Sequence, residues 1–367
     1  MSEKLVSVFS GKKVLITGHT GFKGSWLSLW LTSIGADVTG LSIDIPTAPS
    51  HFQAADLSSG LDDNRLDIRQ ANELSGFIKK LQPEFIFHLA AQPIVRRSYA
   101  DPVEAWQTNT LGTVYMLEAI RGIENPCTVI FITSDKCYDN VEWVWGYRET
   151  DALGGSDPYS ASKGAAELAI RSYVKSFFPK NGHIRIGVGR AGNVIGGGDW
   201  ALDRIVPDCV AAWSKDETVK LRNPSATRPW QHVLEPLSGY LNLAFNLSKD
   251  AKLHGEAFNF GPPAQQNQSV GELVSTMANY WDKVLWEDVS AQYGGPHESG
   301  LLKLNCDKAL FHLGWQAVWG FEETVRETAL WYKQYYANET ISIANFSVKQ
   351  IETYIAMAKE KGLAWAQ

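Results

Sequence analysis

Hydrophobic residues gather in blocks along the first half of the chain. Five short runs of aliphatic and β-branched residues are separated by longer stretches with the spacing of helices. A run without polar alternation indicates a strand buried on both faces, as in parallel sheets covered by helices. The predicted strands are 12–18, 36–44, 84–91, 128–134 and 183–192, and the predicted helices are 22–34, 70–81, 102–121 and 157–178.

This succession of strands and helices predicts an α/β fold with a Rossmann-type, doubly wound parallel sheet. After residue 192 the pattern changes to short mixed segments rich in Gly, Pro and Trp, which predicts a smaller C-terminal lobe that binds the substrate. A helical pattern at 233–248 and a short strand at 256–261 resemble the strands and helices of the first lobe. We therefore expect a nucleotide-binding domain of residues 1–192 and 232–261, and a substrate-binding lobe of residues 193–231 and 262–367.

Three glycines follow the first predicted strand and lead into the first predicted helix. Gly18, Gly21 and Gly24 have the spacing G-x-x-G-x-x-G. Glycine at such a turn lets the backbone approach a pyrophosphate, which binds where the unpaired N–H groups and the dipole of the helix favour negative charge. A tight structural turn is the alternative, but the strand before and the helix after favour a dinucleotide site. At this turn we also expect cofactor contacts from Thr20, Phe22 and Lys23.

The second predicted strand ends at Asp44, twenty residues beyond the last of these glycines. A carboxylate at this place accepts hydrogen bonds from the adenosine ribose hydroxyls. Because residues 38–50 contain no Arg or Lys for a 2′-phosphate, the pattern favours NAD over NADP. Asp67 and Ile68 are expected to bracket the adenine. Residues after the third strand are also expected to line the cofactor: Leu89, Ala90 and Ala91.

Tyr159 and Lys163 stand four residues apart at the start of a predicted helix, so both project from one face. Tyr is a poor base at its unperturbed pKa of about 10. A neighbouring ammonium and a cationic nicotinamide stabilise the phenolate and lower that pKa, which favours proton transfer with a sugar hydroxyl. Such pairs occur by chance in many helices, but this one follows a buried strand that ends in Ser134, within a nucleotide-binding fold.

Several motifs occur in one order over nearly the whole chain, namely "TGHTGFKG", "LDIR", "HLAAQ", "YSASK", "RAGNVIGGGDW" and "RPWQHV". In these motifs the sequence resembles the extended short-chain dehydrogenase/reductase family. The resemblance implies that Ser134, Tyr159 and Lys163 form a catalytic triad, and that the sugar of a nucleotide sugar lies against the nicotinamide of NAD. It also implies a homodimer built from the helices near 102–121 and 157–178, with a homotetramer as the alternative.

The two residues after Ser134 differ among the reactions of this family. In sequences that resemble 4-epimerases these two residues are small and uncharged, whereas dTDP-glucose 4,6-dehydratases have Asp-Glu. This chain has Asp135 and Lys136, and with the following "CYDNVEWVWGYRETDALGGSDPYSASK" it resembles the CDP-glucose 4,6-dehydratases. The resemblance implies a lyase that converts CDP-glucose to CDP-4-keto-6-deoxyglucose and water without net redox change.

A 4,6-dehydratase needs an acid for the departing 6-hydroxyl and a base for the C5 proton. Asp135 is the expected acid. Lys136 is the expected base, and its alternative role is a cation that stabilises the enolate oxygen. The resemblance also suggests deoxysugar biosynthesis for a cell-surface polysaccharide such as the lipopolysaccharide O-antigen. Neither the base of the nucleotide nor the downstream sugar follows from the residues themselves.

Three residues after the last strand of the first domain are candidates for binding the substrate. Asn193 follows that strand at its carboxyl end, where ligands enter open sheets. Arg204 and Arg228 are expected at the diphosphate, because Arg binds phosphate through two parallel donors. Ordinary ion pairs are the alternative for both. Family members often have a further Arg where this chain has His297 and Glu298, so the second side of the phosphate clamp stays open.

Composition narrows the class of partner. The 367 residues carry a formal charge of -6 with scattered cations, which disfavours a nucleic-acid or anionic-membrane surface. Four cysteines without a C-x-x-C pair disfavour zinc and disulfides, so no metal is expected. The N-terminus lacks the apolar core of a signal peptide, which predicts a cytoplasmic protein. The competing hypotheses are a 4-epimerase, a dehydratase of another nucleotide hexose, and a silent NAD-binding regulator, against which the intact triad argues.

Overall fold

The fold is organised by a parallel sheet of seven strands, seen in a computed structural model that describes residues 1–281, 284–292, 301–337 and 342–367. The strand order is β11-β6-β5-β4-β1-β2-β3, and every neighbouring pair is parallel. This order confirms the predicted doubly wound sheet, and it reverses between β1 and β4. The strands are β1 (Lys13–Thr17), β2 (Asp37–Ser42), β3 (Asp62–Arg65), β4 (Phe85–His88), β5 (Cys127–Ile132), β6 (Ile184–Arg190) and β11 (Ala257–Asn259).

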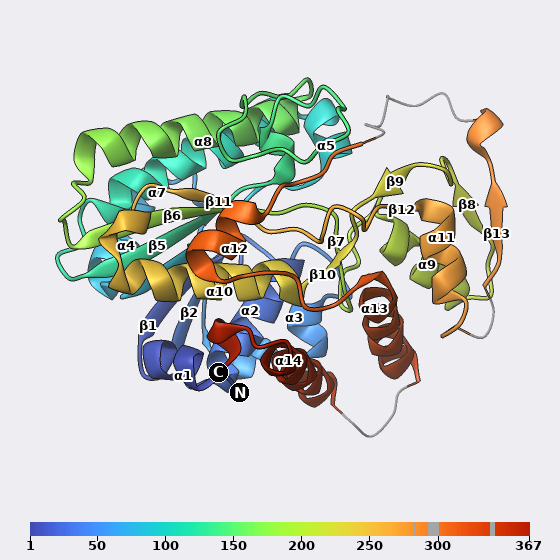
Figure 1. Ribbon diagram of the computed structural model, residues 1–367. Helices are drawn as coiled ribbons and strands as arrows, with labels where there is room; N and C mark the ends of the chain where they lie inside the picture. The colour runs from blue at the N-terminus through green and yellow to red at the C-terminus, as the bar shows by residue number, and fades with distance from the viewer. Residues whose placement is uncertain (282–283, 293–300, 338–341) are drawn as a thin grey trace.

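Helices cover both faces of this sheet (Figure 1). Along β1, Val14 and Ile16 belong to one hydrophobic cluster and Leu15 to the other, because successive side chains of a strand point to opposite faces. This double burial explains the continuous apolar runs of the strands. The cluster of Leu15 includes α4 (Ala71–Leu81), α7 (Gly112–Ile120) and α8 (Pro158–Phe177), and the other includes α1 (Glu3–Phe9), α2 (Phe22–Ser33), α3 (His51–Ala54) and α10 (Leu234–Lys249).

Two elements of the first lobe differ from the sequence pattern. The predicted helix 102–121 is divided into α6 (Pro102–Trp106), a π-helical turn η2 (Gln107–Leu111) and α7, and α5 (Val95–Ala100) precedes it. The edge strand β3 was not predicted, because its sequence "DDNR" has no apolar run. An edge strand pairs on one side only, and polar residues there discourage association with another sheet.

The second lobe consists of short elements at the other end of the molecule (Figure 1). Its two-stranded sheets pair β8 with β13 and β9 with β12, and β7 pairs with β10 between the lobes. Helix α10 packs against β5 and β6, and β11 pairs with β6. Besides α10 and β11, the helices and strands that follow β6 in either lobe are β7 (Val194–Ile195), α9 (Ile205–Trp213), β8 (Val219–Leu221), β9 (Thr227–Arg228), β10 (Gln231–His232), β12 (Gln268–Ser269), α11 (Val270–Met277), β13 (Trp286–Asp288), α12 (Asp307–Leu313), α13 (Phe321–Tyr336) and α14 (Ile343–Glu360).

Helix α14 does not follow the predicted division into lobes. It packs against α2, and the segment after it lies against α1, where Lys4 N donates to Gln367 O at 3.1 Å. Ser2 Oγ also donates to Trp365 O at 2.6 Å. Residues 343–367 therefore complete the core of the first lobe, although the sequence pattern assigned them to the substrate lobe. The other lobe boundaries stay a prediction.

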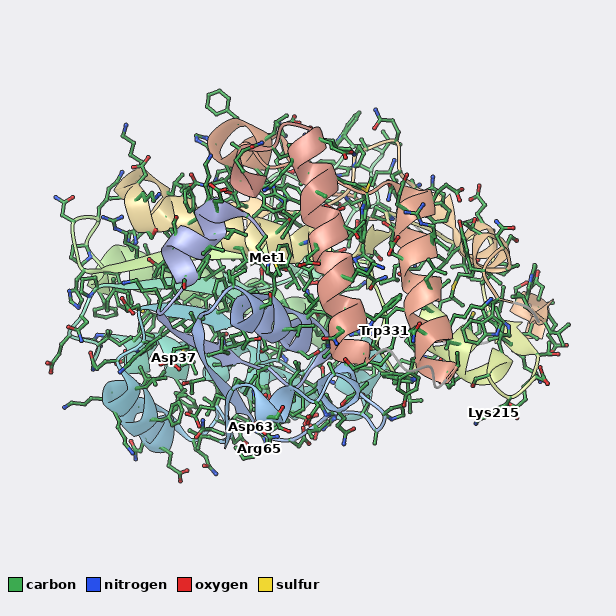
Figure 2. All side chains as sticks on the ribbon, turned by 90° about the horizontal axis from the view of Figure 1, so that it is seen from below. Met1, Asp37, Asp63, Arg65, Lys215 and Trp331 are labelled. Atoms are coloured by element: carbon green, nitrogen blue, oxygen red, sulfur yellow. The ribbon has the colours of Figure 1, made fainter. Side chains whose placement is uncertain are left out.

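Trp331 lies between α13 and α14 (Figure 2). Its Nε1 donates to Ser347 Oγ on α14 at 2.8 Å, and that hydroxyl lies 3.2 Å from His51 Nε2. The other ring nitrogen of His51 lies 2.9 Å from Ser25 Oγ on α2. Burial lowers the pKa of His51 to about 3, so the imidazole is neutral. This chain of polar contacts connects four helices without a buried charge.

A buried carboxylate holds the turn before α13. Glu235 on α10 accepts hydrogen bonds from Val318 N at 2.9 Å and Trp319 N at 2.7 Å. It also accepts one from Tyr354 Oη on α14 at 2.7 Å. Its side chain is fully buried, and this burial raises its pKa to about 7.

The raised pKa of Glu235 makes stability depend on pH. Between the unfolded pKa near 4.5 and about 7, the folded protein binds more protons than the unfolded one, so stability should fall as pH rises through this window. This fall in the free energy of unfolding is on the order of 3 kcal/mol for a fully buried group. The change Glu235→Gln should abolish it, because glutamine does not titrate. Urea unfolding at pH 5 and pH 8 measures it. Equal losses of stability in both proteins would contradict this assignment.

Candidate active site

A cavity of about 470 Å³ opens between the two lobes, at the carboxyl ends of β5 and β6. Its walls come from the ends of both strands, the start of α8, and α9 and β8 of the second lobe. Parallel strands bring their carboxyl ends to the same edge of a sheet, so residues far apart in sequence meet there. Nine of the predicted site residues line the cavity: Phe22, Lys23, Ser134, Asp135, Lys136, Tyr159, Asn193, Arg204 and Arg228.

The acid and the alcohol after β5 contact each other directly. Ser134 Oγ donates to Asp135 Oδ1 at 2.9 Å and accepts from Lys136 N at 3.3 Å, at the start of a single 3₁₀ turn. Asn193 Nδ2 donates to the other carboxylate oxygen of Asp135 at 3.3 Å. A Cβ at Gly192 would overlap this buried carboxylate, so only glycine fits there. Lys136 is half-buried in the cavity wall.

Tyr159 and Lys163 lie in the first turns of α8, which Asp157 caps by accepting from Ser160 N at 3.0 Å. Burial raises the pKa of Tyr159 to about 12, against a hydrogen bond with Ser134 that lowers it. This direction is opposite to the sequence-based expectation, because burial outweighs the cations that the protein itself supplies. Burial also lowers the pKa of Lys163 to about 8. In the protein alone, the phenol is therefore a proton donor at neutral pH.

Lys23 leaves the glycine-rich turn and extends into the catalytic cavity. Its Nζ lies 6.0 Å from the ring centroid of Tyr240, and the residue lines the cavity together with Ser134. Burial lowers the pKa of Lys23 to about 8, with smaller contributions from Lys163 and Arg204. The expected contact of Lys23 with the cofactor stays a prediction, and its charge also acts on the groups around the triad.

A buried ion pair beneath the cavity was missed by the sequence analysis. Arg190 at the end of β6 binds Glu167 of α8 through two hydrogen bonds of 2.8 Å. Thr133, which precedes the triad serine, donates to Glu167 at 2.5 Å, and Arg190 also donates to Tyr138 Oη at 2.7 Å. The available signal was the i, i+4 spacing of Lys163 and Glu167 on one helix face.

The glycine-rich turn has the geometry that a pyrophosphate requires. Gly18 has φ +76°, and a Cβ on it would lie 2.8 Å from Ala90 N. A Cβ at Gly24 would overlap the carbonyl oxygen of Gly18. Gly21 caps α2 without a side-chain hydrogen bond, so backbone N–H groups face the entry of the helix. The residues present therefore fit a dinucleotide, and Phe22 at the start of α2 also lines the cavity.

The expected ribose and adenine contacts lie beside this turn. Asp44 is exposed two residues after β2, and its carbonyl oxygen accepts from Thr20 Oγ1 at 2.6 Å, so Thr20 holds the backbone at Asp44. The carboxylate of Asp67 binds Arg69 at 2.7 Å, while Ile68 is buried against Gly112. Three partly buried residues follow β4: Leu89, Ala90 and Ala91. Their contacts with a cofactor stay predictions.

His19 of the glycine motif was also missed. Its Nδ1 lies 2.9 Å from Ser42 Oγ and its Nε2 lies 2.7 Å from Asp63 Oδ1, and Asp63 also pairs with Arg65. Figure 2 shows Asp63 and Arg65 together at the edge of the sheet. Burial lowers the pKa of His19. A Cβ at Gly40 would overlap the imidazole, so His19 fixes the spacing between the turn and β2.

The two predicted diphosphate ligands both line the cavity. Arg204 pairs with Asp199 at 2.7 Å and acts electrostatically on Tyr159, so its guanidinium lies at the catalytic end of the cavity. Arg228 donates to Thr227 O at 2.8 Å and lines the cavity beside Lys136. His297 and Glu298 lie outside the described residues.

Two further arginines in the cavity wall were not predicted. Arg96 of α5 pairs with Asp203 at 2.8 Å, and Arg222 after β8 approaches the same carboxylate at 3.4 Å. They bring the first and second lobes together at the mouth of the cavity. Because the arginines and Asp203 come from three segments far apart in the sequence, no local motif predicts that they meet.

Two other classes of site were searched in the described part of the chain. Its His, Cys, Asp and Glu side chains form no group of three that would hold a metal ion. Among the helices described, none has both the length and the hydropathy that crossing a membrane requires.

Proteins similar to this chain in sequence include dehydratases and epimerases of nucleotide sugars. Residues 15–328 match the family model described as GDP-mannose 4,6 dehydratase. A CDP-glucose 4,6-dehydratase of Salmonella typhimurium (strain LT2) is 46% identical over 355 residues, which cover 95% of this chain and 97% of the relative. A dTDP-glucose 4,6-dehydratase of Shigella flexneri is 24% identical over 87% of this chain and 92% of the relative.

A solved structure of UDP-glucose 4-epimerase from Stenotrophomonas maltophila with bound NAD has a TM-score of 0.75 and 19% identity, and it covers 89% of this chain and 100% of that chain. At this identity the likeness concerns the fold alone. The family model spans most of the chain, and the Salmonella relative matches it over almost the whole length of both proteins. The chain therefore belongs to the GDP-mannose 4,6-dehydratase family, within the extended short-chain dehydrogenases/reductases.

Proposed function

We propose that this protein is an NAD-dependent CDP-glucose 4,6-dehydratase, a lyase that forms CDP-4-keto-6-deoxyglucose and water. The observation that carries the proposal is the acid and amine of Asp135 and Lys136, directly after Ser134 in a cavity that also contains Tyr159. The 46% identity to a CDP-glucose 4,6-dehydratase supports the same reaction. A 4-epimerase has no need for an acid and a base at these positions.

The first step is oxidation at C4 of the glucose. NAD, when bound, supplies the acceptor for the C4 hydride and later the donor to C6. Tyr159 takes the proton of the 4-hydroxyl, with Ser134 as its hydrogen-bond partner. Tyr159 must be a phenolate before it accepts this proton, and the positive charges of Lys163 and Lys23 around the cavity favour that form. The resulting ketone makes the C5 hydrogen acidic.

The second step removes water across C5 and C6. Lys136 takes the C5 proton, and Asp135 gives a proton to the departing 6-hydroxyl. The contacts of Asp135 with Ser134 and Asn193 hold its carboxyl group at the cavity wall. When C6 is reduced, the protonated Lys136 returns a proton to C5. The atoms balance as loss of one water with no net oxidation.

We further propose that the protein works as a homodimer or homotetramer in the cytoplasm, in deoxysugar synthesis for a cell-surface polysaccharide such as the O-antigen. Exposed apolar side chains on the expected helices support a dimer face. They are Val103, Trp106, Leu111, Leu168 and Phe177.

Incubation with CDP-glucose tests the reaction. A dehydratase yields a 4-keto-6-deoxy product with an alkali-developed chromophore, a 4-epimerase yields CDP-galactose, and a binding protein yields neither. Formation of CDP-galactose alone would overturn the proposed function.

The change Tyr159→Phe should leave NAD bound and lower turnover by about 10²-fold to 10⁴-fold, because the acceptor of the 4-hydroxyl proton is lost. Turnover of CDP-glucose and cofactor content of the purified protein measure the two effects. Tyr173→Phe on the same helix is the matched control and should retain activity. Near-normal turnover in the Tyr159 variant would remove this residue from the mechanism.

The change Lys136→Met should allow oxidation at C4 but block uptake of deuterium at C5 in heavy water. NADH absorbance in a single turnover reports the first step, and mass spectrometry of recovered sugar reports the second. Lys175→Met on the exposed side of α8 controls for loss of a lysine. Unimpaired exchange at C5 would leave Lys136 only the stabilisation of the enolate.

The change Asp44→Ala should weaken retention of NAD by about 10-fold or more, because a carboxylate that accepts from both ribose hydroxyls is removed. Cofactor occupancy after gel filtration measures it. Asp37→Ala at the opposite end of β2 is the control, and Figure 2 labels its position. Full occupancy in the Asp44 variant would show that the ribose binds elsewhere.

A further inference from the structure

The catalytic cavity extends well beyond the triad into the second lobe. Residues 219–223 at β8 and residues 204–208 at the start of α9 line this extension. The glycine-rich turn and the triad occupy the side of the first lobe. If the sugar lies at Tyr159, as the proposed function requires, the nucleotide half of the substrate must extend towards β8 and α9. The side chains there are the candidates to recognise the base.

Asp208 is the acid among the residues of α9 that line this extension. It lies in the first turn, half-buried. The charged groups that face it are Arg222 just after β8, Arg96 from α5 and Asp203 from the preceding loop, and its carboxyl group accepts a hydrogen bond from the backbone N–H of Asp203. Burial raises the pKa of Asp208 to about 6, above the pKa of an exposed Asp. A carboxylate has about four acceptor positions, so one backbone hydrogen bond leaves capacity for a ligand.

The pyrimidine bases differ in the chemistry that a carboxylate detects. Cytosine carries an amine donor at C4, whereas thymine and uracil carry an oxygen acceptor there. The two adjacent positions, N3 and O2, are both acceptors in cytosine, and in uracil N3 becomes a donor. A carboxylate next to an arginine offers one acceptor and two donors, which complements the edge of cytosine. With uracil, the carboxylate would face another acceptor at C4, and the arginine would face another donor at N3.

Asp208 and Arg222 provide this combination on facing elements. Both line the cavity, both interact with Asp203, and the charge of Arg222 acts on the carboxyl group of Asp208. Arg96 approaches the carboxylate of Asp203 from the first lobe. The dTDP-, UDP- and GDP-sugars share the diphosphate with CDP-glucose, so the diphosphate cannot distinguish them.

We propose that Asp208 accepts a hydrogen bond from the C4 amine of the base and that Arg222 donates to its N3 and O2, which selects cytosine over uracil and thymine. This inference rests on the proposed function, and it assigns the nucleotide specificity of that same site. The alternative is a purely structural ion pair between the two side chains.

Calorimetric titration of the NAD-loaded protein with CDP and with UDP tests the assignment. Wild type should bind CDP more tightly than UDP. Asp208→Asn should lower this preference by about 10-fold to 100-fold, because an amide can present a donor to uracil as readily as an acceptor to cytosine. Asp216→Asn, on an exposed turn of the same lobe, makes the same change of charge and should keep the wild-type preference.

Equal weakening of CDP and UDP by Asp208→Asn would overturn the proposal, because a structural ion pair affects both ligands alike. A wild type with no preference between CDP and UDP would overturn it as well. Turnover assays with CDP-, UDP-, dTDP- and GDP-glucose separate this failure from failure of the proposed function. If the wild type dehydrates all four nucleotide sugars equally, the specificity assignment is wrong and the proposed function stands. If it dehydrates none of them, both the specificity assignment and the proposed function are wrong.

A second measurement needs no variant. As pH falls through about 6, Asp208 takes a proton, becomes a weaker acceptor for the amine and gains a donor for the C4 oxygen of uracil, so the ratio of the Kd for UDP to the Kd for CDP should fall. The terminal phosphates of both ligands titrate in the same range, and the ratio removes their common effect. A ratio that is constant from pH 5 to pH 8 would contradict the role of Asp208.

Discussion

The buried ion pair between Arg190 and Glu167 is the interaction on which the active site depends. It joins the end of β6 to α8, and Thr133 adds the end of β5 through its bond to the same carboxylate. Loss of one partner would leave an uncompensated buried charge, which costs about 3–5 kcal/mol in comparable cases. Because Thr133 precedes Ser134 and Glu167 follows Lys163 by one helical turn, the pair fixes the distance between the two sides of the triad.

Positive charge is concentrated around the catalytic cavity that this ion pair supports. Lys23, Lys163 and Arg204 approach the cavity from three elements, and burial lowers the pKa of both lysines to about 8. The cost of holding these cations together decreases when a negative group enters, so the site favours an anionic substrate and the phenolate form of Tyr159. Asp135 and Asp199 lie among them and limit the excess of charge. The same arrangement serves both binding and oxidation.

Local patterns predicted the parts of the structure that local interactions determine. Buried strands, the glycine-rich turn and the spacing of Tyr159 and Lys163 all follow from a few adjacent residues. The polar edge strand β3, the return of α14 to the first lobe and the meeting of Arg96 with Asp203 depend on tertiary packing. The direction of the pKa shift of Tyr159 belongs to this second group, since burial in the folded protein decides it.

The position of α14 has a consequence for how the protein reaches its native state. The first lobe begins with α1 and α2, yet their apolar faces are covered by residues 343–366. During synthesis the domain that is made first must wait for these residues before its core closes, and its apolar surface stays open to chaperones or to aggregation until then. The first lobe has its full core only when the last helix is present. A fragment limited to the glycine-rich half would therefore lack one wall of its own core.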